Sequence, residues 1–441
     1  MEAPGPPRRF LGALFDLQRD PLTFLMRTAR EFGPVAQFRV GPRRVMMLTD
    51  PAHIEHVLKD RNTNYGKQTR GFQKLRLALG QGLLTSEGEL WRTQRRIAQP
   101  AFHRERIAHF AKVMVEETET RMREWQDGTQ LDLASEMMAL TLRIIARTQF
   151  SADFSEKLQK TIGDAVTTIN VDLIERTLSF PDFPLYLPTP ANRRLKRALG
   201  ILNELIFKEI ERRRGREEEL TDLLSMLMQA RDEHGQPMTV EQLRDEFVTM
   251  TVAGHETTAN AMAWTFYLLS RHPQVARRLK EELAGLSDRP RFEDLPSLTY
   301  TRAVVQESMR LYPPVWVLAR NAIEDDVIGG YSVRAGTILM LPPYVVHRNP
   351  HFWKNPEGFD PERFMTEDPA RPRFAYFPFG GGPRQCIGMS FAMMEAQLIL
   401  ATIAQKFELE VAPGFQPLAQ PLITLRPRDG MPMTVRAHPT C

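Results

Sequence analysis

The sequence predicts a mainly α-helical protein with a small β portion. Apolar residues recur every three or four positions, the spacing of an amphipathic helix, in several long segments. These segments are residues 10–30, 106–125, 131–150, 191–214, 221–231, 239–271 and 389–407. Strand-like runs are shorter. They fall in residues 35–48, in residues 322–340 with Gly329-Gly330 as a turn, and in residues 409–434.

The organisation of the chain predicts a single domain. A length of 441 residues would allow two or three domains. The chain nevertheless contains no Ser/Gly linker, no low-complexity tract and no repeat of fixed period. We therefore expect one domain over residues 1–441, with an α-rich body and a smaller β-rich lobe.

The longest predicted helix covers residues 239–271. Thr239 and Gln242 form a possible capping box at its start, and Pro273 ends it. Some 32 residues at a rise of about 1.5 Å give a length of roughly 48 Å, so this helix can cross the whole protein.

The middle of this helix has an unusual sequence, Ala253-Gly254-His255-Glu256-Thr257-Thr258. Gly254 costs about 1 kcal/mol relative to Ala in a helix interior, and the two threonines can bond back to a carbonyl and bend the helix. A local opening here would leave room for dioxygen and water. Alternatively, Gly254 allows close packing and Thr257 fills a polar gap.

Cys386 is the most informative single residue. The chain has two cysteines, and the other, Cys441, is the last residue. A zinc site needs about four N or S ligands, which Cys386 cannot assemble here, whereas one thiolate can serve as the axial ligand of haem iron. Cys386 follows three consecutive glycines, which would let a loop bend beneath a flat ring and aim backbone N–H groups at the sulfur. The alternative is a buried structural thiol.

The run around Cys386 resembles the haem-binding loop of the cytochrome P450 family. The residues that carry the resemblance, in the order F-x-x-G-x-R-x-C-x-G, are Phe379, Gly382, Arg384, Cys386 and Gly388. The resemblance extends over essentially the whole chain. It implies a cytochrome P450 fold with the long central helix over the haem, which periodicity alone does not name.

A second stretch resembles the E-x-x-R motif of the same family. Glu307 and Arg310 lie three residues apart and therefore on one helix face. In the family this pair joins a further arginine before the Cys loop, and Arg363 corresponds to it. Taken alone, Glu307 and Arg310 could be a surface ion pair worth less than about 1 kcal/mol.

The resemblance also assigns roles at the site. Glu256 and Thr257 correspond to the acid–alcohol pair that delivers protons during oxygen activation. Trp91 and Arg95, one turn apart on a predicted helix, correspond to residues that reach the haem propionates, for which a guanidinium is suited. Outside the family context, a Trp and an Arg on one helix are as often packing or surface residues. The expected cofactor-binding residues are Trp91, Arg95, Ala253, Gly254, Arg320, Phe379, Gly382, Arg384, Cys386, Ile387 and Gly388, with Cys386 as the iron ligand.

The activity implied by the resemblance is that of a haem-thiolate monooxygenase with haem b as cofactor and O2 as co-substrate. No flavin or nicotinamide fingerprint opens a βαβ unit, so electrons from NAD(P)H should arrive through a ferredoxin or flavodoxin with its reductase. Two alternatives remain open, a peroxide-using or oxygen-independent relative (peroxygenase, dehydratase) and a haem protein that binds ligands without catalysis.

The expected substrate is lipophilic, of the fatty acid, terpenoid, carotenoid or steroid class, because the candidate contact segments are mostly apolar. Such a pocket discriminates poorly among shapes of this kind. The candidate contact segments are residues 66–84, 170–183 and 315–318, with Ala253, Ile423 and Thr424.

Composition favours a cytoplasmic protein, and the resemblance implies a member of the bacterial type, which we expect to be a monomer. Two cysteines leave no disulfide framework, and residues 1–20 contain no apolar stretch of about 18 residues or signal-peptide core, so we expect no stable membrane insertion. A net charge of +4 and a pI of about 9.0 are too mild to indicate nucleic-acid binding.

The arginines near Trp91 form a basic cluster that could attract an acidic electron donor. Its members are Arg92, Arg95, Arg96, Arg104 and Arg106. The alternative is a solvated basic face without a partner.

Overall fold

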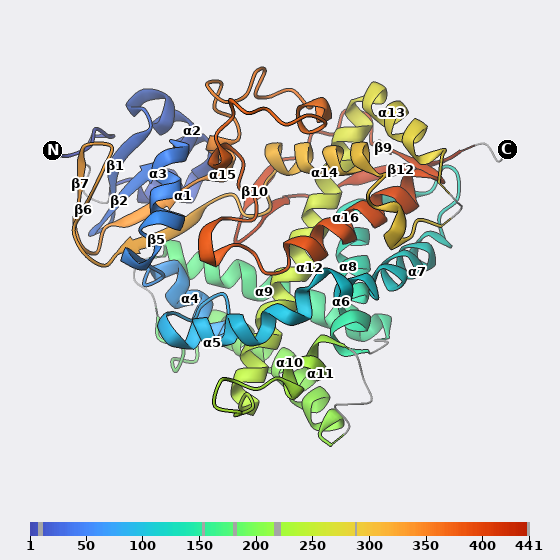
Figure 1. The fold of residues 1–441 in the computed structure, drawn as a ribbon, viewed down its shortest axis with the longest axis horizontal. Coiled ribbons are helices and arrows are strands. Elements are labelled where there is room, and N and C mark those ends of the chain that lie inside the picture. Colours follow the sequence, from blue (N-terminus) through green and yellow to red (C-terminus); the bar gives the residue numbers. More distant parts are fainter. Residues whose placement is uncertain (8–11, 152–154, 180–182, 216–221, 287–288, 439–441) are drawn as a thin grey trace.

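The computed structural model describes residues 1–7, 12–151, 155–179, 183–215, 222–286 and 289–438. Helices make up most of it, and the small β-sheets lie on both sides of the helical body, with blue and orange strands at the left and red strands at the right (Figure 1). The predicted mainly α fold with a small β portion is therefore confirmed. Among the described residues, no helix combines the length and the apolar character that crossing a bilayer requires.

The helices are distributed along the whole chain, and the longest of them is α12. They are α1 (Leu14–Arg19), α2 (Pro21–Phe32), α3 (Pro51–Glu55), α4 (Arg70–Leu79), α5 (Gly88–Ala98), α6 (Arg104–Ala108), α7 (Ala111–Met122), α8 (Leu133–Phe150), α9 (Glu156–Leu178), α10 (Pro190–Arg213), α11 (Leu223–Gln229), α12 (Val240–Arg271), α13 (Pro273–Leu283), α14 (Thr299–Leu311), α15 (Pro343–Val346) and α16 (Met389–Ala404).

The strands are short, and they form one five-stranded sheet and three smaller sheets. They are β1 (Val35–Val40), β2 (Arg43–Leu48), β3 (Tyr65–Gly66), β4 (Gln130–Asp132), β5 (Leu318–Ala322), β6 (Asp326–Ile328), β7 (Tyr331–Val333), β8 (Ile338–Leu341), β9 (Phe407–Val411), β10 (Ala419–Pro421), β11 (Leu425–Pro427) and β12 (Pro432–Ala437). The five-stranded sheet has the order β1-β2-β8-β5-β3, and all its neighbours are antiparallel except β2 and β8.

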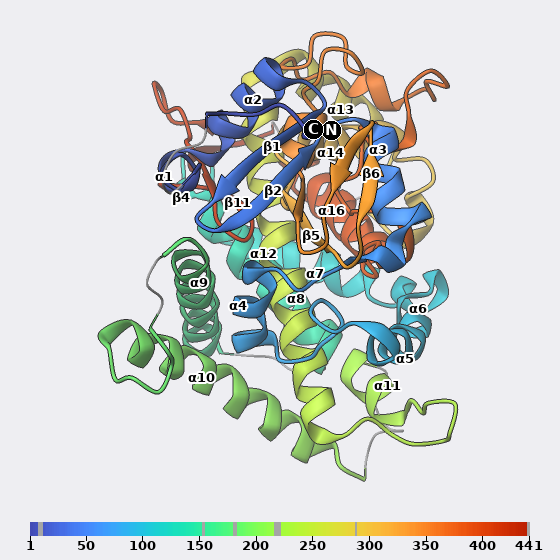
Figure 2. The same ribbon diagram turned by 90° about the vertical axis from the view of Figure 1, so that its left-hand side faces the viewer.

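Helix α12 crosses the middle of the molecule, with α8 and α16 packed along it (Figures 1 and 2). Its predicted capping box is present, since the Thr239 hydroxyl accepts from the Gln242 N–H at 3.2 Å and the Gln242 side chain accepts from the Thr239 N–H at 2.8 Å. The helix is continuous from Val240 to Arg271. The predicted local opening at its centre is therefore wrong.

Two predicted helices are each divided in the structure. The segment 10–30 becomes α1 and α2, because the Asp20 carboxylate accepts from the Thr23 N–H at 3.1 Å and starts a new helix with Pro21 at its first position; residues 10 and 11 lie outside the described residues. The segment 106–125 becomes α6 and α7.

Two further helix boundaries differ from the prediction, and a predicted turn is confirmed. Residues 131 and 132 belong to strand β4, and α8 begins only at Leu133, where the Asp132 side chain caps it. Helix α16 ends at Ala404, because β9 starts at Phe407. The predicted turn at Gly329-Gly330 is confirmed, as both glycines have positive φ and join β6 to β7.

Helix α9 was not predicted, although it has 23 residues. Its apolar stripe includes Ile162, Val166 and Ile169, but buried polar side chains interrupt it. Asn170, Asp172 and Arg176 are all less than 10% exposed. Asn170 bonds to Glu256 of α12, and Arg176 bonds to Asn192 of α10 and to Asp172 of its own helix. These pairings allow the side chains to be buried, and the spacing of apolar residues does not reveal them.

Candidate functional site

The loop that carries Cys386 folds back on itself directly before α16. The Cys386 N–H donates to the Phe379 carbonyl at 3.0 Å, which closes the loop, and residues 382–384 form a short 3₁₀ turn inside it. Phe379 packs against one side of the core and Ile387 against another. The side chain of Cys386 is thus presented from a closed loop at the start of a helix.

Three glycines of this loop are required by its geometry. Gly380 and Gly382 have φ of +69° and +65°, a region that favours glycine. A Cβ at Gly382 would lie 1.8 Å from the Leu58 carbonyl oxygen, and one at Gly381 would lie 2.3 Å from the Phe374 ring. Gly388 differs, because its φ is −86° and an added Cβ would meet nothing closer than 3.8 Å. The polypeptide alone therefore does not require a glycine at position 388.

Cys386 and Ala253 fit a large group that the polypeptide does not supply. Protein surrounds Cys386 closely enough that burial raises the pKa of its thiol, while the Gly388 N–H and the charge of Arg95 lower that pKa. The Cys386 side chain is nevertheless exposed, and so is Ala253 in the middle of α12. Both residues therefore face space within the molecule, as expected if a haem covers them.

The charge around this space also fits a haem. Burial, the larger cause, lowers the pKa of Arg320 and of Arg384 to about 10. The charge of Arg320 further lowers the pKa of Lys67 and of Arg384, and Arg384 also lowers that of Lys67. Glu87 is the acidic residue that acts on all three. A buried excess of positive charge is costly unless anions pair with it, and the two propionates of a haem are such anions.

The predicted propionate residues are brought together, with one difference in pairing. Trp91 and Arg95 both lie on α5, as predicted. The guanidinium of Arg384, however, stacks 3.8 Å from the centre of the Trp91 ring, while Arg95 donates to the Gln385 carbonyl at 2.8 Å. Trp91 therefore orients Arg384, and Arg95 supports the Cys loop.

Lys67 belongs to this cluster and was missed in the sequence. It is 6% exposed, donates from Nζ to the Leu84 carbonyl at 2.7 Å, and has a pKa that burial holds well below its usual range. No motif surrounds it. Lys67 is recognised by its burial. Among the hydrogen bonds of the described chain, its Nζ has no carboxylate partner, and only the folded structure reveals this.

The acid and the alcohol on α12 bond to different partners. Thr257 donates from its hydroxyl to the Ala253 carbonyl at 2.6 Å. The Glu256 carboxyl is buried and accepts a hydrogen bond from the Asn170 amide of α9. Burial raises the pKa of Glu256, while interactions with Thr424, Arg426 and Asn260 lower it.

Gly254 has a packing role in the structure. A Cβ at this position would lie 2.9 Å from Cδ1 of Ile145, so the glycine lets α8 approach α12 closely. This matches the close-packing alternative considered for the sequence.

The predicted join between Glu307, Arg310 and Arg363 is present and buried. Arg310 donates from Nε and Nη2 to the two Glu307 oxygens at 2.7 and 2.8 Å, and both side chains are 0% exposed. Arg363 donates to Glu307 at 3.3 Å, and Arg310 also donates to the carbonyls of His347, Pro356 and Gly358. The pair is therefore not the surface ion pair of the alternative interpretation, and it fixes the segment that precedes the Cys loop.

Glu395 of α16 makes the stability of the protein depend on pH. The residue is 0% exposed beside Thr258 of α12, and burial raises its pKa to about 8. Because this pKa is raised, the folded protein retains a proton on Glu395 at pH values at which the unfolded chain has released it. The unfolding free energy is therefore highest below the pKa of the unfolded chain and falls as the pH rises towards about 8.

We expect the unfolding free energy of the protein to fall by roughly 3–4 kcal/mol between about pH 5 and pH 8 from this group alone. Glu395→Gln should flatten the curve, because the amide is neutral at both pH values. Urea unfolding at the two pH values measures the difference. An equal loss in the Gln variant and in the wild type would contradict the assignment.

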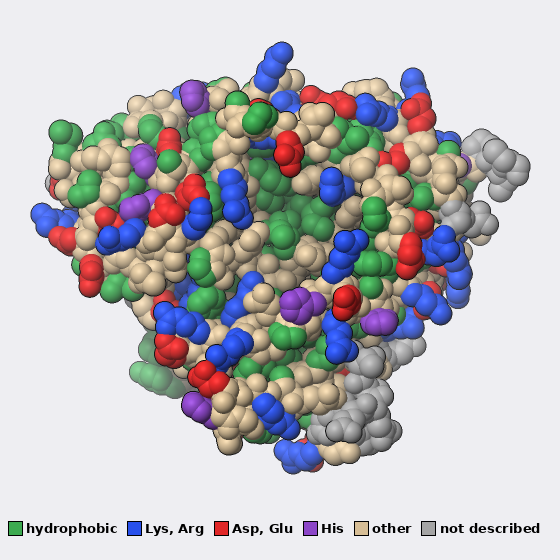
Figure 3. Space-filling view, in the orientation of Figure 1, with side chains coloured by type: hydrophobic (Ala, Val, Ile, Leu, Met, Phe, Trp, Pro, Cys, Tyr) green, Lys and Arg blue, Asp and Glu red, His purple; other side chains and the backbone are tan. Residues whose placement is uncertain are grey.

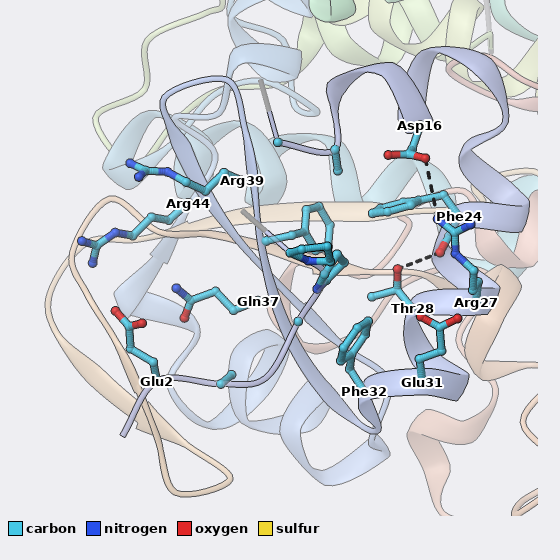
Figure 4. Close-up of a pocket in the computed structure, with 17 residues that line it drawn as sticks. Glu2, Asp16, Phe24, Arg27, Thr28, Glu31, Phe32, Gln37, Arg39 and Arg44 are labelled. Atoms are coloured by element: carbon cyan, nitrogen blue, oxygen red, sulfur yellow. Dashed lines mark hydrogen bonds and ion pairs between the residues drawn. The ribbon is translucent and has the colours of Figure 1, made fainter. Parts of the chain in front are cut away.

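A separate cavity of about 520 Å3 lies between the N-terminal segment, α1, α2 and the β1–β2 hairpin (Figure 4). Aromatic rings of Phe24, Phe32 and Phe38 line it, and the ion pair of Asp16 with Arg27 lies at its wall. None of its lining residues is a predicted site residue.

Comparison with known proteins gives consistent matches. The model of the family described as cytochrome P450 matches residues 3–430. The chain is 37% identical over 408 residues to cyclooctat-9-en-7-ol 5-monooxygenase of Streptomyces melanosporofaciens, covering 92% of this chain and 88% of that protein. It is 35% identical to cyclooctatin synthase of the same organism, with 95% and 90% covered. It is 33% identical to pentalenene oxygenase of Streptomyces avermitilis, with 91% and 90% covered.

Proposed function

The chain belongs to the cytochrome P450 family, and on that premise we propose that Cys386 supplies the thiolate ligand of its haem iron. The single observation that carries this proposal is the exposed thiol of Cys386 inside a closed, glycine-bent loop. The helix that starts at Met389 and the Gly388 N–H both favour the thiolate form.

The family identifies the protein as a cytochrome P450 monooxygenase, whose reaction is RH + O2 + 2 e⁻ + 2 H⁺ → ROH + H2O. The haem supplies oxygen activation when it is bound. In our proposal, Lys67, Arg95, Arg320 and Arg384 pair with the propionates, and Trp91 holds Arg384 in place. Phe379, Gly382, Ile387 and Gly388 shape the proximal loop, and Ala253 and Gly254 form the helix surface opposite Cys386.

Two residues of α12 handle protons in this proposal. Glu256 takes up a proton at its carboxyl, and the Thr257 hydroxyl orders the water that passes it into the cavity. The peroxygenase and dehydratase alternatives are less favoured, because relatives of those kinds tend to replace the acid–alcohol pair, which is intact here.

The substrate we propose is a terpenoid, the class to which the named substrates of two relatives, cyclooctat-9-en-7-ol and pentalenene, belong. The half-exposed apolar side chains of Val315, Val317 and Leu318 precede or begin β5 and suit a substrate without charge. We also propose that the haem is haem b and that the protein is cytoplasmic.

Reconstitution with a ferredoxin, its reductase, NADH and labelled dioxygen tests the proposed activity. One labelled oxygen atom should appear in the product of a terpenoid panel, and the other should appear in water. Efficient product formation from hydrogen peroxide without a donor would instead favour the peroxygenase alternative.

We propose that the electron donor is a ferredoxin or a flavodoxin and that it docks near α5. We also propose that the protein is a monomer. A hollow of about 360 Å3 there is lined by Trp91, Arg92, Arg95, Arg96, Gln99, Pro100 and His103. Lys and Arg side chains surround a partly apolar, hollowed centre on the face that includes α5 and α16 (Figure 3). Two arginines of the predicted cluster are already paired, Arg92 with Glu89 and Arg96 with Glu233, so the free positive charge is smaller than the sequence indicates.

Reduction by an acidic donor should slow as salt rises, because exposed charges are screened beyond about 8 Å at physiological ionic strength. Arg96→Glu should slow it roughly tenfold at low salt, within the usual range of electrostatic steering. Stopped-flow reduction measures both effects. The control is Arg436→Glu on β12, which changes the net charge equally and also removes one exposed ion pair. Equal slowing by both variants, or no salt dependence, would show that the donor docks elsewhere.

A further inference from the structure

The segment of residues 80–87, between α4 and α5, gathers cations beside the Cys loop. Three successive backbone carbonyls of this segment each accept a hydrogen bond from a different cationic side chain. The hydrogen bonds are those of Lys67 to Leu84 at 2.7 Å, of Arg76 to Thr85 at 2.9 Å and of Arg384 to Ser86 at 2.9 Å. The 80–87 segment is therefore a row of acceptors for side chains from three separate parts of the chain.

Helix α12 fixes the first half of the 80–87 segment. The Asp245 carboxylate accepts from the Gln81 N–H at 2.7 Å, and the buried Glu246 carboxyl accepts from the Leu83 N–H at 3.0 Å. Hydrogen bonds to ionised carboxylates are roughly twice as strong as those between neutral groups. The carbonyls that follow in the segment are thus held in place relative to the long helix.

Glu87 ends the row of acceptors with a carboxylate. Its two oxygens accept from the Lys67 N–H and from the Gln68 side-chain amide. Nη2 of Arg76 also donates to it at 3.4 Å. The Glu87 side chain is only 23% exposed, so it faces the cation cluster more than solvent.

The charge of Glu87 is important because the cations beside it exceed what a haem can neutralise. Burial lowers the pKa of Arg320 and of Arg384, and the charge of Glu87 opposes both shifts. Together with Lys67, these arginines outnumber the two propionates of a haem. Positive charge beside a haem favours its ferrous form, because ferric iron carries one more positive charge. A carboxylate in the same place favours the ferric form.

We propose that Glu87 is a positioning residue that holds the cations for the haem propionates and keeps the reduction potential of the haem low. It ties Lys67 and Arg76 to the start of α5, and its negative charge offsets part of the positive charge of the cluster. Electrons from the donor therefore enter the haem with a smaller driving force than the cations alone would give. This inference rests on the proposed pairing of the cluster with the propionates.

A spectroelectrochemical titration of the haem-loaded protein measures the reduction potential without turnover. Glu87→Gln keeps the size of the side chain but removes its charge. The ratio of ferrous to ferric haem at a fixed applied potential should therefore rise about tenfold, which equals about 59 mV for a one-electron couple. An unchanged or lower ratio in this variant would overturn the proposal.

Two matched variants separate the charge of Glu87 from its shape. Glu89→Gln removes a carboxylate two residues further on, whose side chain is 82% exposed. Solvent and salt screen that charge, so the ratio should stay within about twofold of the wild type. Glu87→Asp keeps the charge but shortens the side chain, and it should change the ratio less than Glu87→Gln does. An equal rise in either control would show that the charge at Glu87 does not set the potential.

Gln68→Glu gives an independent answer even where Glu87→Gln does not retain its haem. The change adds a carboxylate beside Glu87 at an exposed position and keeps an acceptor for Arg76. The ratio of ferrous to ferric haem should fall, and a rise or no change would overturn the proposal. Loss of the carbon monoxide band of the reduced wild type would instead contradict the haem-thiolate function, and this inference with it.

Discussion

Glu307→Ala is expected to destabilise the protein by about 3–5 kcal/mol, because it leaves the fully buried Arg310 and the mostly buried Arg363 without their carboxylate. Arg310 and Arg363 both donate to Glu307, and Asp360 donates its backbone N–H to the same carboxylate at 2.9 Å. The segment that leads to the Cys loop would lose its anchor. The measurements are the urea unfolding free energy and the haem content after purification, both of which should fall sharply.

Glu362→Ala is the matched control for this variant. Glu362 lies in the same segment and pairs with Arg278, but both side chains are about half exposed. An exposed ion pair contributes at most about 1 kcal/mol. Normal haem content and an unchanged unfolding free energy in Glu307→Ala would mean that the buried network does not hold the Cys loop.

Thr257→Val should separate oxygen consumption from product formation. Valine keeps the branched shape of threonine but removes the hydroxyl that orders water for proton delivery. Haem binding and substrate affinity should persist. The ratio of product to NADH consumed should fall by about tenfold or more, with the lost flux appearing as hydrogen peroxide.

Thr265→Val controls for the loss of a threonine from α12. Thr265 donates to the Ala261 carbonyl at 2.7 Å, the same backbone contact that Thr257 makes with Ala253, but it lies two turns further along the helix. The control should keep the wild-type ratio. If Thr257→Val also keeps it, Thr257 is a packing residue and the proton must come from Glu256 or a bound water.

The sequence was most informative where local pattern and chemistry coincide. Cys386, its glycines and the Glu307–Arg310 pair stand at fixed spacings, and the structure shows the bends and the buried bonds that those spacings predict. The capping box of α12 could also be predicted from the sequence, because Thr239 and Gln242 are three residues apart.

The sequence was least informative where contacts join distant segments. Lys67 meets Arg320 and Arg384 across more than half of the chain, and nothing near Lys67 indicates this. Asn170 reaches Glu256 from α9, a helix whose buried polar residues disrupt the apolar period that sequence reading depends on. The continuity of α12 was also missed, because back-bonding by Thr257 occurs within an intact helix and does not require an opening.

The reduced carbon monoxide difference spectrum tests the central claim, that Cys386 is the thiolate ligand of haem iron. The wild type should absorb at about 450 nm, since thiolate electron density on the iron produces that band. Cys386→Ser should lose the band, and Cys441→Ser, at a position outside the described residues, should keep it. A band that survives in Cys386→Ser or disappears in Cys441→Ser would contradict the assignment.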